Sequence, residues 1–501
     1  MTEDASTIEG SEAGVTLHPP RRRAAWLWLL VLFTLGSYVW FLSPSFLPEP
    51  QGKTTYYDLL AQGFLAGTPF LAFEPDARLA NLTNPYSPGE REGIPYLHDA
   101  SYFRGKYSLY FGPAPGAIVA LLRLLSGAGL QDDWLTFLGI AAGYAASCLI
   151  LLSLKKDLFP DLPFLPFAAA IAVAGFANPM LWTLNYPAYN TAAIAWGAAF
   201  LLAGTYVALP SLEGRETQMW RPILASLLWG CSLGSRLSLG PGLLVLNGVL
   251  AWRVAGLPWQ QLGRRIRRAA VALLPFFVAV ALLGAYNFVR FGSAAETGFR
   301  YALTGTDFTA FSRTFAAEYI PFNLFNYLAK RPGASSTFPY IDADLGRRSL
   351  PWLGGAPSTM HAPVQIAGVL LTTPYVLLAG LALALLLVKR RPPALGHRTS
   401  GEGRSAAGLL ATLSLGFVLV LAPLLLFFYS SMRYILDFSP LLVIIASIGS
   451  WAAYRASAGQ GFARKALAIV VMTTALLSVA QGWLLALSDS PALAWWHSIL
   501  G

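Results

Sequence analysis

A cluster of polar and aromatic residues stands out in a chain that is otherwise strongly apolar. It contains a carboxylate, two cations and several aromatic rings, including Asp99, Arg104, Lys106, Tyr107 and Tyr110. A carboxylate can accept the proton of a nucleophile, and cationic side chains can hold a phosphate. The cluster therefore predicts group transfer from a phosphorylated donor, with Asp99 as general base. The alternative is a loop aspartate that caps a turn, surrounded by aromatic residues that hold the loop against a membrane surface.

Arg236 interrupts an apolar stretch that extends from Leu224 to Leu246. Glycine lies on both sides of it and Pro241 follows, so two short apolar helices are predicted to meet at a charge. Broken helices with a charge at the break commonly build a binding site that faces a water-filled cavity. A guanidinium offers a planar, bidentate donor for phosphate oxygens, so Arg236 is predicted to hold a phosphate. The alternative is an interfacial arginine that extends to lipid headgroups.

Further candidate site residues lie at the edges of apolar segments. Asp58, on a short predicted helix from Tyr56 to Gly67, is a second candidate catalytic carboxylate or metal contact; a solvated helix-surface residue is the alternative. Arg433 is predicted either to share the donor phosphate or to pair with Asp437 one helical turn on. The start of the second hydrophilic segment contributes weaker candidates for donor binding: Arg290, Glu296 and Arg300.

The sequence shows no metal-ligand or nucleotide-binding motif. His98 is adjacent to Asp99, but no second His, Cys or carboxylate follows at the spacing of a metal site. The metal ligands are therefore unknown from the sequence, and a divalent cation is left open as a cofactor. No glycine-rich phosphate loop is present, so a site for ATP or a nucleotide sugar is not predicted.

The composition is that of a polytopic membrane protein. Hydrophobic residues make up 55% of the 501 positions and charged residues 12%, against about 25% in ordinary soluble domains. Cys148 and Cys231 both lie in apolar segments, which gives no disulfide framework and no zinc pattern. The first 23 residues end in three arginines, and the apolar run that follows ends in aromatic residues, which predicts a retained anchor rather than a cleaved signal peptide.

The apolar runs predict an all-α integral membrane protein with about eleven membrane spans. The spans are 24–42, 134–154, 162–182, 189–209, 222–235, 237–252, 269–289, 365–388, 406–429, 434–454 and 466–487. With the amino terminus (1–23) in the cytoplasm, most basic residues of the short connections fall inside, so the net charge of +10 is mainly an orientation signal and nucleic acid is not a predicted partner. The chain then divides into a transmembrane module, 24–289, that includes a first outer loop, 43–133; a second outer loop, 290–364; and carboxy-terminal helices, 365–501.

A rival topology counts 109–127 as a span and fuses 222–252 into one helix. It would bury Arg236 at mid-membrane depth, at a cost of about 2.5–3.5 kcal/mol on insertion scales. The apolar part of 109–127 is also short and contains Pro113, Pro115 and Arg123. These residues favour an interfacial or re-entrant helix over a span.

This layout resembles the GT-C superfamily of polyprenyl-phosphate-sugar glycosyltransferases, and more closely its bacterial branch related to protein mannosyltransferases and lipid A aminoarabinose transferases. The segment from Tyr57 to Gly67 is similar to the family's Tyr-x-x-(Leu/Ile)-(Ala/Ser) helix with its following glycine, and the segment from Asp99 to Pro115 resembles a loop of bacterial members. In the family, a basic residue at the break between spans five and six contacts the carrier phosphate, and Arg236 matches it.

The chain also departs from the family pattern. The acidic residue or pair that usually precedes the first short helix is replaced by Lys53 and Thr54, and the second outer carboxylate is replaced by Asn185 and Tyr186. Asp99 or Asp58 must therefore supply the base, or the activity is altered or lost.

The resemblance implies a GT-C-like bundle with two large outer-face loops that carry interfacial helices. It implies a plasma-membrane enzyme that moves a sugar from a polyprenyl-phosphate carrier to a glycan, lipid or protein acceptor on the periplasmic or outer face. Asp99 would be the base, and Arg236 would hold the carrier phosphate with Arg433 or Lys106. The alternatives are a transporter or flippase of lipid-linked substrates and a catalytically degenerate scaffold. The sequence does not indicate the sugar.

Overall fold

The computed structural model describes residues 20–42, 54–256, 259–310, 313–336, 338–343, 357, 359–361, 365–387, 399–488, 490 and 493. Its α-helices are α1 (Pro20–Leu42), α2 (Tyr56–Leu65), α3 (Ala114–Ser126), α4 (Asp132–Leu158), α5 (Phe164–Phe176), α6 (Met180–Thr183), α7 (Tyr189–Leu212), α8 (Trp220–Leu233), α9 (Gly240–Val254), α10 (Leu262–Phe291), α11 (Ile320–Leu328), α12 (Val369–Thr372), α13 (Ala379–Leu387), α14 (Thr399–Leu426), α15 (Ser439–Ala456) and α16 (Gly461–Leu487).

Short 3-10 helices and two small hairpins complete the described elements. The 3-10 helices are η1 (Ala77–Asn81), η2 (Leu237–Leu239), η3 (Trp259–Gln261), η4 (Phe299–Tyr301), η5 (Phe308–Ala310), η6 (Ala317–Tyr319), η8 (Pro374–Leu378) and η10 (Met432–Asp437). The antiparallel hairpins are β1 (Ser101–Phe103) with β2 (Lys106–Ser108), and β3 (Gly333–Ala334) with β4 (Ile341–Asp342). The predicted all-α class is confirmed as a mostly helical fold, in which the described strands belong to these two short hairpins.

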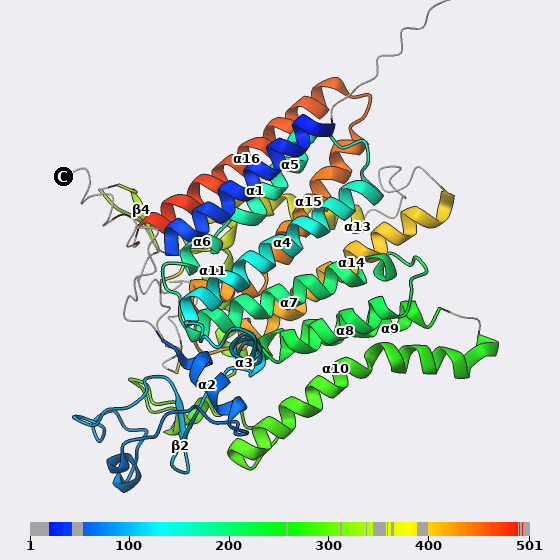
Figure 1. The fold of residues 1–501 in the computed structure, drawn as a ribbon. Helices are drawn as coiled ribbons and strands as arrows, with labels where there is room; N and C mark the ends of the chain where they lie inside the picture. Colours follow the sequence, from blue (N-terminus) through cyan, green and yellow to red (C-terminus); the bar gives the residue numbers. More distant parts are fainter. Residues whose placement is uncertain are drawn as a thin grey trace, which may run out of the picture.

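Long apolar helices form the bundle, and eight helical segments of the described chain are long and apolar enough to cross a membrane. Helix α4 packs on α7, α7 on α8, and α8 on α10, and α1 and α16 lie side by side at the other edge (Figure 1). The predicted multi-pass membrane protein is confirmed in this form, whereas the count of eleven spans is not. Helix α8 has 14 residues, about 21 Å of helix, against a bilayer core of roughly 30 Å.

The chain breaks between α8 and α9, as the residues around Arg236 predict. Ser232 of α8 donates to the Gly197 carbonyl at 2.8 Å, and Trp229 donates to the Leu201 carbonyl at 3.2 Å, so α8 runs antiparallel to α7. Helix α9 then packs against α14. The fused helix of the rival topology is wrong, because the glycines and the arginine end one helix before η2 and α9 begin.

Helix α3 is shorter than the helices that are long and apolar enough to cross a membrane. It has 13 residues, and its Leu121, Leu124 and Leu125 are exposed, while its Gly116 lies against Leu60 of α2. One face therefore packs on α2 and the opposite apolar face is uncovered, which is the pattern of a helix lying at a membrane interface.

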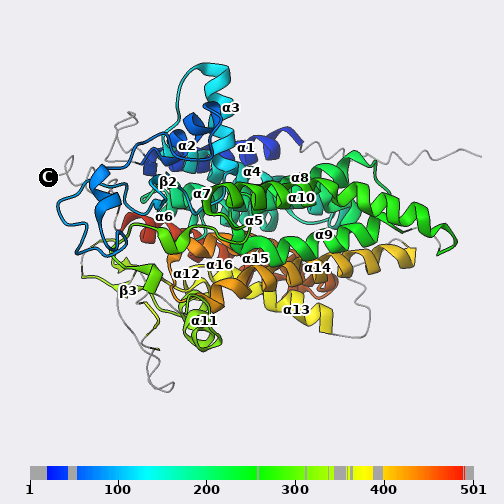
Figure 2. The same ribbon diagram turned by 90° about the horizontal axis from the view of Figure 1, so that it is seen from below.

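The two loop segments gather at one end of the bundle, called here the loop end. Figure 2 shows α2 and α3 on one side of this end and α11 and β3 on the other. The first loop has a hydrophobic core of its own, in which Tyr102, Tyr107 and Phe111 are buried together with Leu303 of the second loop. The alternative in which aromatic residues hold the loop against a membrane is wrong for these three rings, because they fill this core instead.

The topology can be tested with single cysteines in a background where Cys148 and Cys231 are replaced by serine. Cysteines at Glu92 and Tyr186, both exposed at the loop end, should react with a membrane-impermeant maleimide from the same side. A cysteine at Glu216, at the opposite end of α7, should react only after the membrane is permeabilised. Equal labelling of positions 186 and 216 in intact cells would contradict the arrangement.

Candidate functional site

Asp99 is held at the loop end by residues from three separate segments. Its backbone N–H donates to the Leu303 carbonyl at 2.8 Å, and its φ of 62° lies in the left-handed region. The Tyr110 hydroxyl donates to both carboxylate oxygens, at 3.1 and 3.0 Å, and the Tyr189 hydroxyl donates to Oδ2. A strained backbone at an aspartate that is held by several partners is typical of functional sites.

The environment of Asp99 shifts its proton affinity. Burial raises the pKa of this carboxyl, and the hydrogen bonds from Tyr189 and Tyr110 together with the charge of Arg433 counter part of that effect. The net pKa lies above the ordinary value of an aspartate. A carboxylate with a raised pKa is a stronger base than a solvated one, which suits proton removal from a hydroxyl or amide nucleophile.

Tyr189 was not predicted as a site residue. It is the first residue of α7, and the centre of its ring lies 4.5 Å from that of Tyr56, at the start of α2, with the two rings tilted by 34°. The Tyr56 hydroxyl donates to the His98 carbonyl at 2.6 Å, directly before the aspartate. The start of α7 thus positions both the carboxylate and the loop around it.

Arg433, on η10, acts on this carboxylate through its charge. Its guanidinium carbon is 5.5 Å from the centre of the Tyr434 ring, and it is near enough to Asp99 to lower the pKa of that group. Its Nε atom is buried and has no hydrogen-bond partner among the described residues. Arg433 therefore has unused donor capacity next to the candidate base.

Arg236 forms a buried ion pair with Asp437. The Nε atom lies 3.0 Å from Oδ2, with the arginine side chain 11% exposed and the aspartate fully buried. Its guanidinium also stacks 4.6 Å from the Tyr434 ring, on which Arg433 lies as well. The two arginines and Asp99 thus lie at the same end of the bundle, and the ring of Tyr434 lies against both guanidinium groups.

Of the two alternatives for Arg433, the pairing with Asp437 is wrong, because Asp437 pairs with Arg236. That expectation assumed an α-helix, in which residues four apart share a face. The segment Met432–Asp437 is a 3-10 helix with three residues per turn, which turns the side chains of residues 433 and 437 away from each other. Asp437 could have been recognised as a buried carboxylate at a span end, which requires a cationic partner.

Asp58 and Asp132 hold α2 in place. Asp58 makes a two-pronged ion pair with Arg123 of α3, at 2.6 and 2.7 Å, which occupies its carboxylate. Asp132, at the start of α4, accepts from the backbone N–H groups of Tyr56 and Tyr57 at 2.8 and 3.1 Å. Because the first turn of a helix has unpaired N–H groups, this distant carboxylate caps α2. Lys53 lies outside the described residues.

The remaining candidates make contacts of their own within the loops. Arg104 and Lys106 lie at the exposed tip of the β1–β2 hairpin, where Lys106 pairs with Glu74 at 3.1 Å. Tyr107 is buried and its hydroxyl accepts from the Leu97 N–H. Arg290 is buried at the end of α10, where it donates to the Leu109 carbonyl and to Asn287. Glu296 and Arg300 pair with each other at 2.9 Å.

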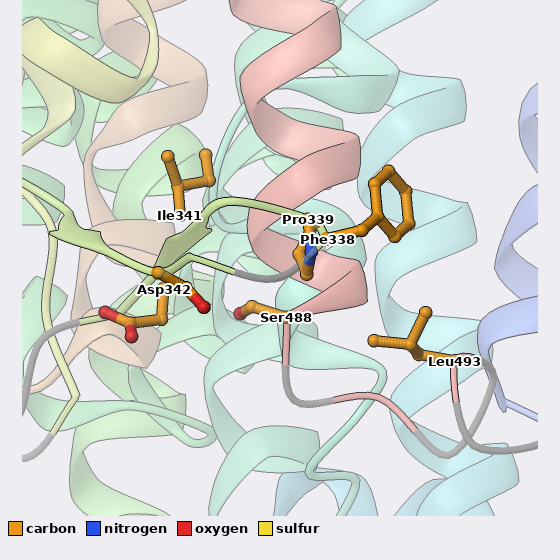
Figure 3. Close-up of a pocket in the computed structure, with 7 residues that line it drawn as sticks. Phe338, Pro339, Ile341, Asp342, Ser488 and Leu493 are labelled. Carbon is orange, nitrogen blue, oxygen red and sulfur yellow. The ribbon is translucent and has the colours of Figure 1, made fainter. Parts of the chain in front are cut away.

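No group of three or more His, Cys, Asp or Glu residues that could hold a metal ion occurs in the described part of the chain. A cavity of about 410 Å³ lies elsewhere in the loops, between the β3–β4 hairpin and the end of α16 (Figure 3). Asp342 is the charged residue in its lining, and none of the candidates above contributes to it.

The fold and site together define a multi-pass helical membrane protein with a charged, tyrosine-rich site at its loop end. No family model and no curated protein matches the chain. It is similar to solved structures of the oligosaccharyltransferase of Archaeoglobus fulgidus. The apo form gives a TM-score of 0.42 at 11% identity over 95% of this chain and 57% of that chain. The complex with an inhibitory peptide and a dolichol-phosphate gives 0.40 at 11% identity over 92% and 56%.

The chain thus spans about 57% of the length of the protein it matches. The GT-C superfamily and its bacterial branch stay predictions from the sequence motifs. Similarity at this level assigns no donor, acceptor or residue role.

A double-mutant cycle of Asp58 and Arg123 tests whether Asp58 is a structural residue or the catalytic base. Asp58→Ala and Arg123→Ala should each lower the free energy of unfolding by roughly 1 kcal/mol or less, because the ion pair is partly solvated. The double variant should lose little more than either single one. If Asp58 were the base, Asp58→Ala alone would abolish turnover while Arg123→Ala would not.

Proposed function

We propose that the chain is a membrane glycosyltransferase that moves a sugar from a polyprenyl-phosphate carrier to an acceptor at the outer face. The observation that supports this most is the convergence of a raised-pKa carboxylate, Asp99, with the cation Arg433 at one end of an apolar bundle. A lipid-linked sugar phosphate requires a base for the acceptor and a cation for the leaving group, beside a surface that a lipid tail can reach. The resemblance of Tyr57–Gly67 and Arg236 to GT-C motifs points to the same donor class.

The proposed reaction is a direct displacement at the anomeric carbon. Asp99 takes the proton of the acceptor O–H or N–H, a bond forms between that atom and the anomeric carbon, and the bond from the anomeric carbon to the phosphate oxygen breaks. The carrier leaves as a phosphate with one more negative charge on its oxygens. Tyr110 and Tyr189 orient the carboxylate, which is the geometry needed before the acceptor binds.

Arg433 is the better candidate for the leaving phosphate, and Arg236 is assigned a positioning role. Arg236 is nearly inaccessible and its charge is balanced by Asp437. The Nε donor of Arg433 has no partner in the described chain. A charged donor placed where negative charge develops stabilises the transition state without reorganisation.

We assign the two loops to the outer side of the membrane. The basic residues of the short connections lie mostly at the opposite ends of the helices, which is the pattern of cytoplasmic connections.

The central test replaces Asp99 with asparagine in the purified full chain. With a synthetic polyprenyl-phosphate sugar as donor, the variant should release free lipid phosphate at least about a hundredfold more slowly, because the base is lost, while its melting temperature stays close to that of the unmodified protein. Glu74→Gln, which changes an exposed carboxylate of the same loop, is the matched control and should retain activity. Full turnover by the Asp99 variant would remove it as base, and no release by the unmodified protein would favour a scaffold or a transporter.

The acid limb of the pH–rate profile should report Asp99. Activity should fall as pH drops through the raised pKa of this carboxyl, because a protonated Asp99 cannot accept the acceptor's proton. The Tyr110 hydroxyl lowers that pKa, so Tyr110→Phe should move the acid limb to higher pH while the rate on the plateau changes less. An acid limb that stays in place in Tyr110→Phe would show that another group titrates.

A further inference from the structure

A second charged cavity lies at the opposite end of the bundle, away from Asp99. Its volume is about 460 Å³, and its lining comes from the α7–α8 connection, the end of α9 and the start of α10. Four arginines and one glutamate line it: Arg215, Arg253, Arg265, Arg268 and Glu216. The glycosyl-transfer reaction proposed above uses none of these residues.

The arginines of this cavity differ in how they are paired among the described residues. Arg215 is neutralised, since its Nη2 atom lies 2.8 Å from Asp157 and 2.6 Å from Glu213. Arg253 stacks 5.0 Å from the Trp252 ring, and its Nε atom is buried with no hydrogen-bond partner in the described part of the chain. A buried guanidinium nitrogen without an acceptor is costly, so an acceptor from outside the chain would be stabilised there.

The start of α10 contributes two further arginines to the lining. Arg265 and Arg268 are three residues apart on the helix, so their like charges lie on one face. Like charges at this spacing repel each other, and a bound anion would reduce that repulsion.

Apolar side chains border the same arginines. Trp252, Leu262 and Ile266 are all exposed, and Leu262 and Ile266 are one turn apart on α10. A phosphate in the cavity would therefore have apolar surface beside it that suits an acyl chain. Basic pockets between membrane helices on the cytoplasmic side are a known binding mode for anionic headgroups.

We propose that this cavity binds the phosphate group of an anionic ligand, held by Arg253 and Arg268, and that the ligand is an anionic phospholipid of the inner leaflet. The site is separate from the proposed catalytic site and does not depend on the glycosyltransferase assignment. A bidentate arginine–phosphate contact is the chemistry on which it rests.

The test measures the thermal unfolding of the full chain in detergent as phosphatidylglycerol, phosphatidylcholine or inorganic phosphate is added. Phosphatidylglycerol should raise the melting temperature more than phosphatidylcholine. Arg253→Gln and Arg268→Gln should each weaken the apparent affinity about tenfold, because each removes one charged donor. Arg267→Gln carries the same charge change on the same helix outside the cavity lining and should leave the affinity unchanged.

The outcomes are distinct. A shift with inorganic phosphate alone that both variants lose would identify a soluble phosphate as the source of the same chemistry. Equal effects of phosphatidylglycerol and phosphatidylcholine, or an equal loss in Arg267→Gln, would overturn the proposal. The two variants lie on different helices, so if one does not fold, the other still decides the question. A negative result in this test would not bear on the proposed glycosyl transfer, in which Asp99 is the base.

Discussion

The buried ion pair between Arg236 and Asp437 is the interaction on which the loop end depends. It joins the break between α8 and α9 to η10 across 201 residues of sequence, and it orients Tyr434 between the two arginines. Removing one partner of such a pair typically costs about 3–5 kcal/mol, because the other charge stays buried without compensation. The pair therefore fixes the position of Arg433, its neighbour on η10, relative to the carboxylate of Asp99.

Several carboxylates at the loop end are structural, and their partners explain why. Asp132 caps α2 and Asp58 ties α2 to α3, so each is already engaged by N–H groups that a substrate would have to displace. Asp99 differs in that its partners are tyrosine hydroxyls, which are neutral donors. Neutral donors position a carboxylate without lowering its basicity as far as an arginine would.

The sequence predicted what local patterns encode. Apolar runs marked the long helices, and the glycines around Arg236 marked the break, because helix length and helix termination depend on neighbouring residues. The cluster that contains Asp99 and Tyr110 was found from composition alone. Contacts between residues far apart in the sequence are not encoded in local patterns. Tyr189 lies 90 residues from Asp99, and Asp58 lies 65 residues from Arg123. The 3-10 geometry of η10, which decides the partner of Asp437, was likewise hidden.

The strain at Asp99 makes the folding of the first loop a condition for the site. A left-handed aspartate costs on the order of 1–3 kcal/mol and persists only where its surroundings determine it. The surroundings here are the Leu303 carbonyl, the tyrosine hydroxyls and the loop core that buries Tyr107 and Phe111. Arg290 adds a tie from the end of α10 to the Leu109 carbonyl, next to Tyr110. The carboxylate is therefore positioned by the whole loop core, and the charge of Arg433 reaches it only when that core rests on the start of α7.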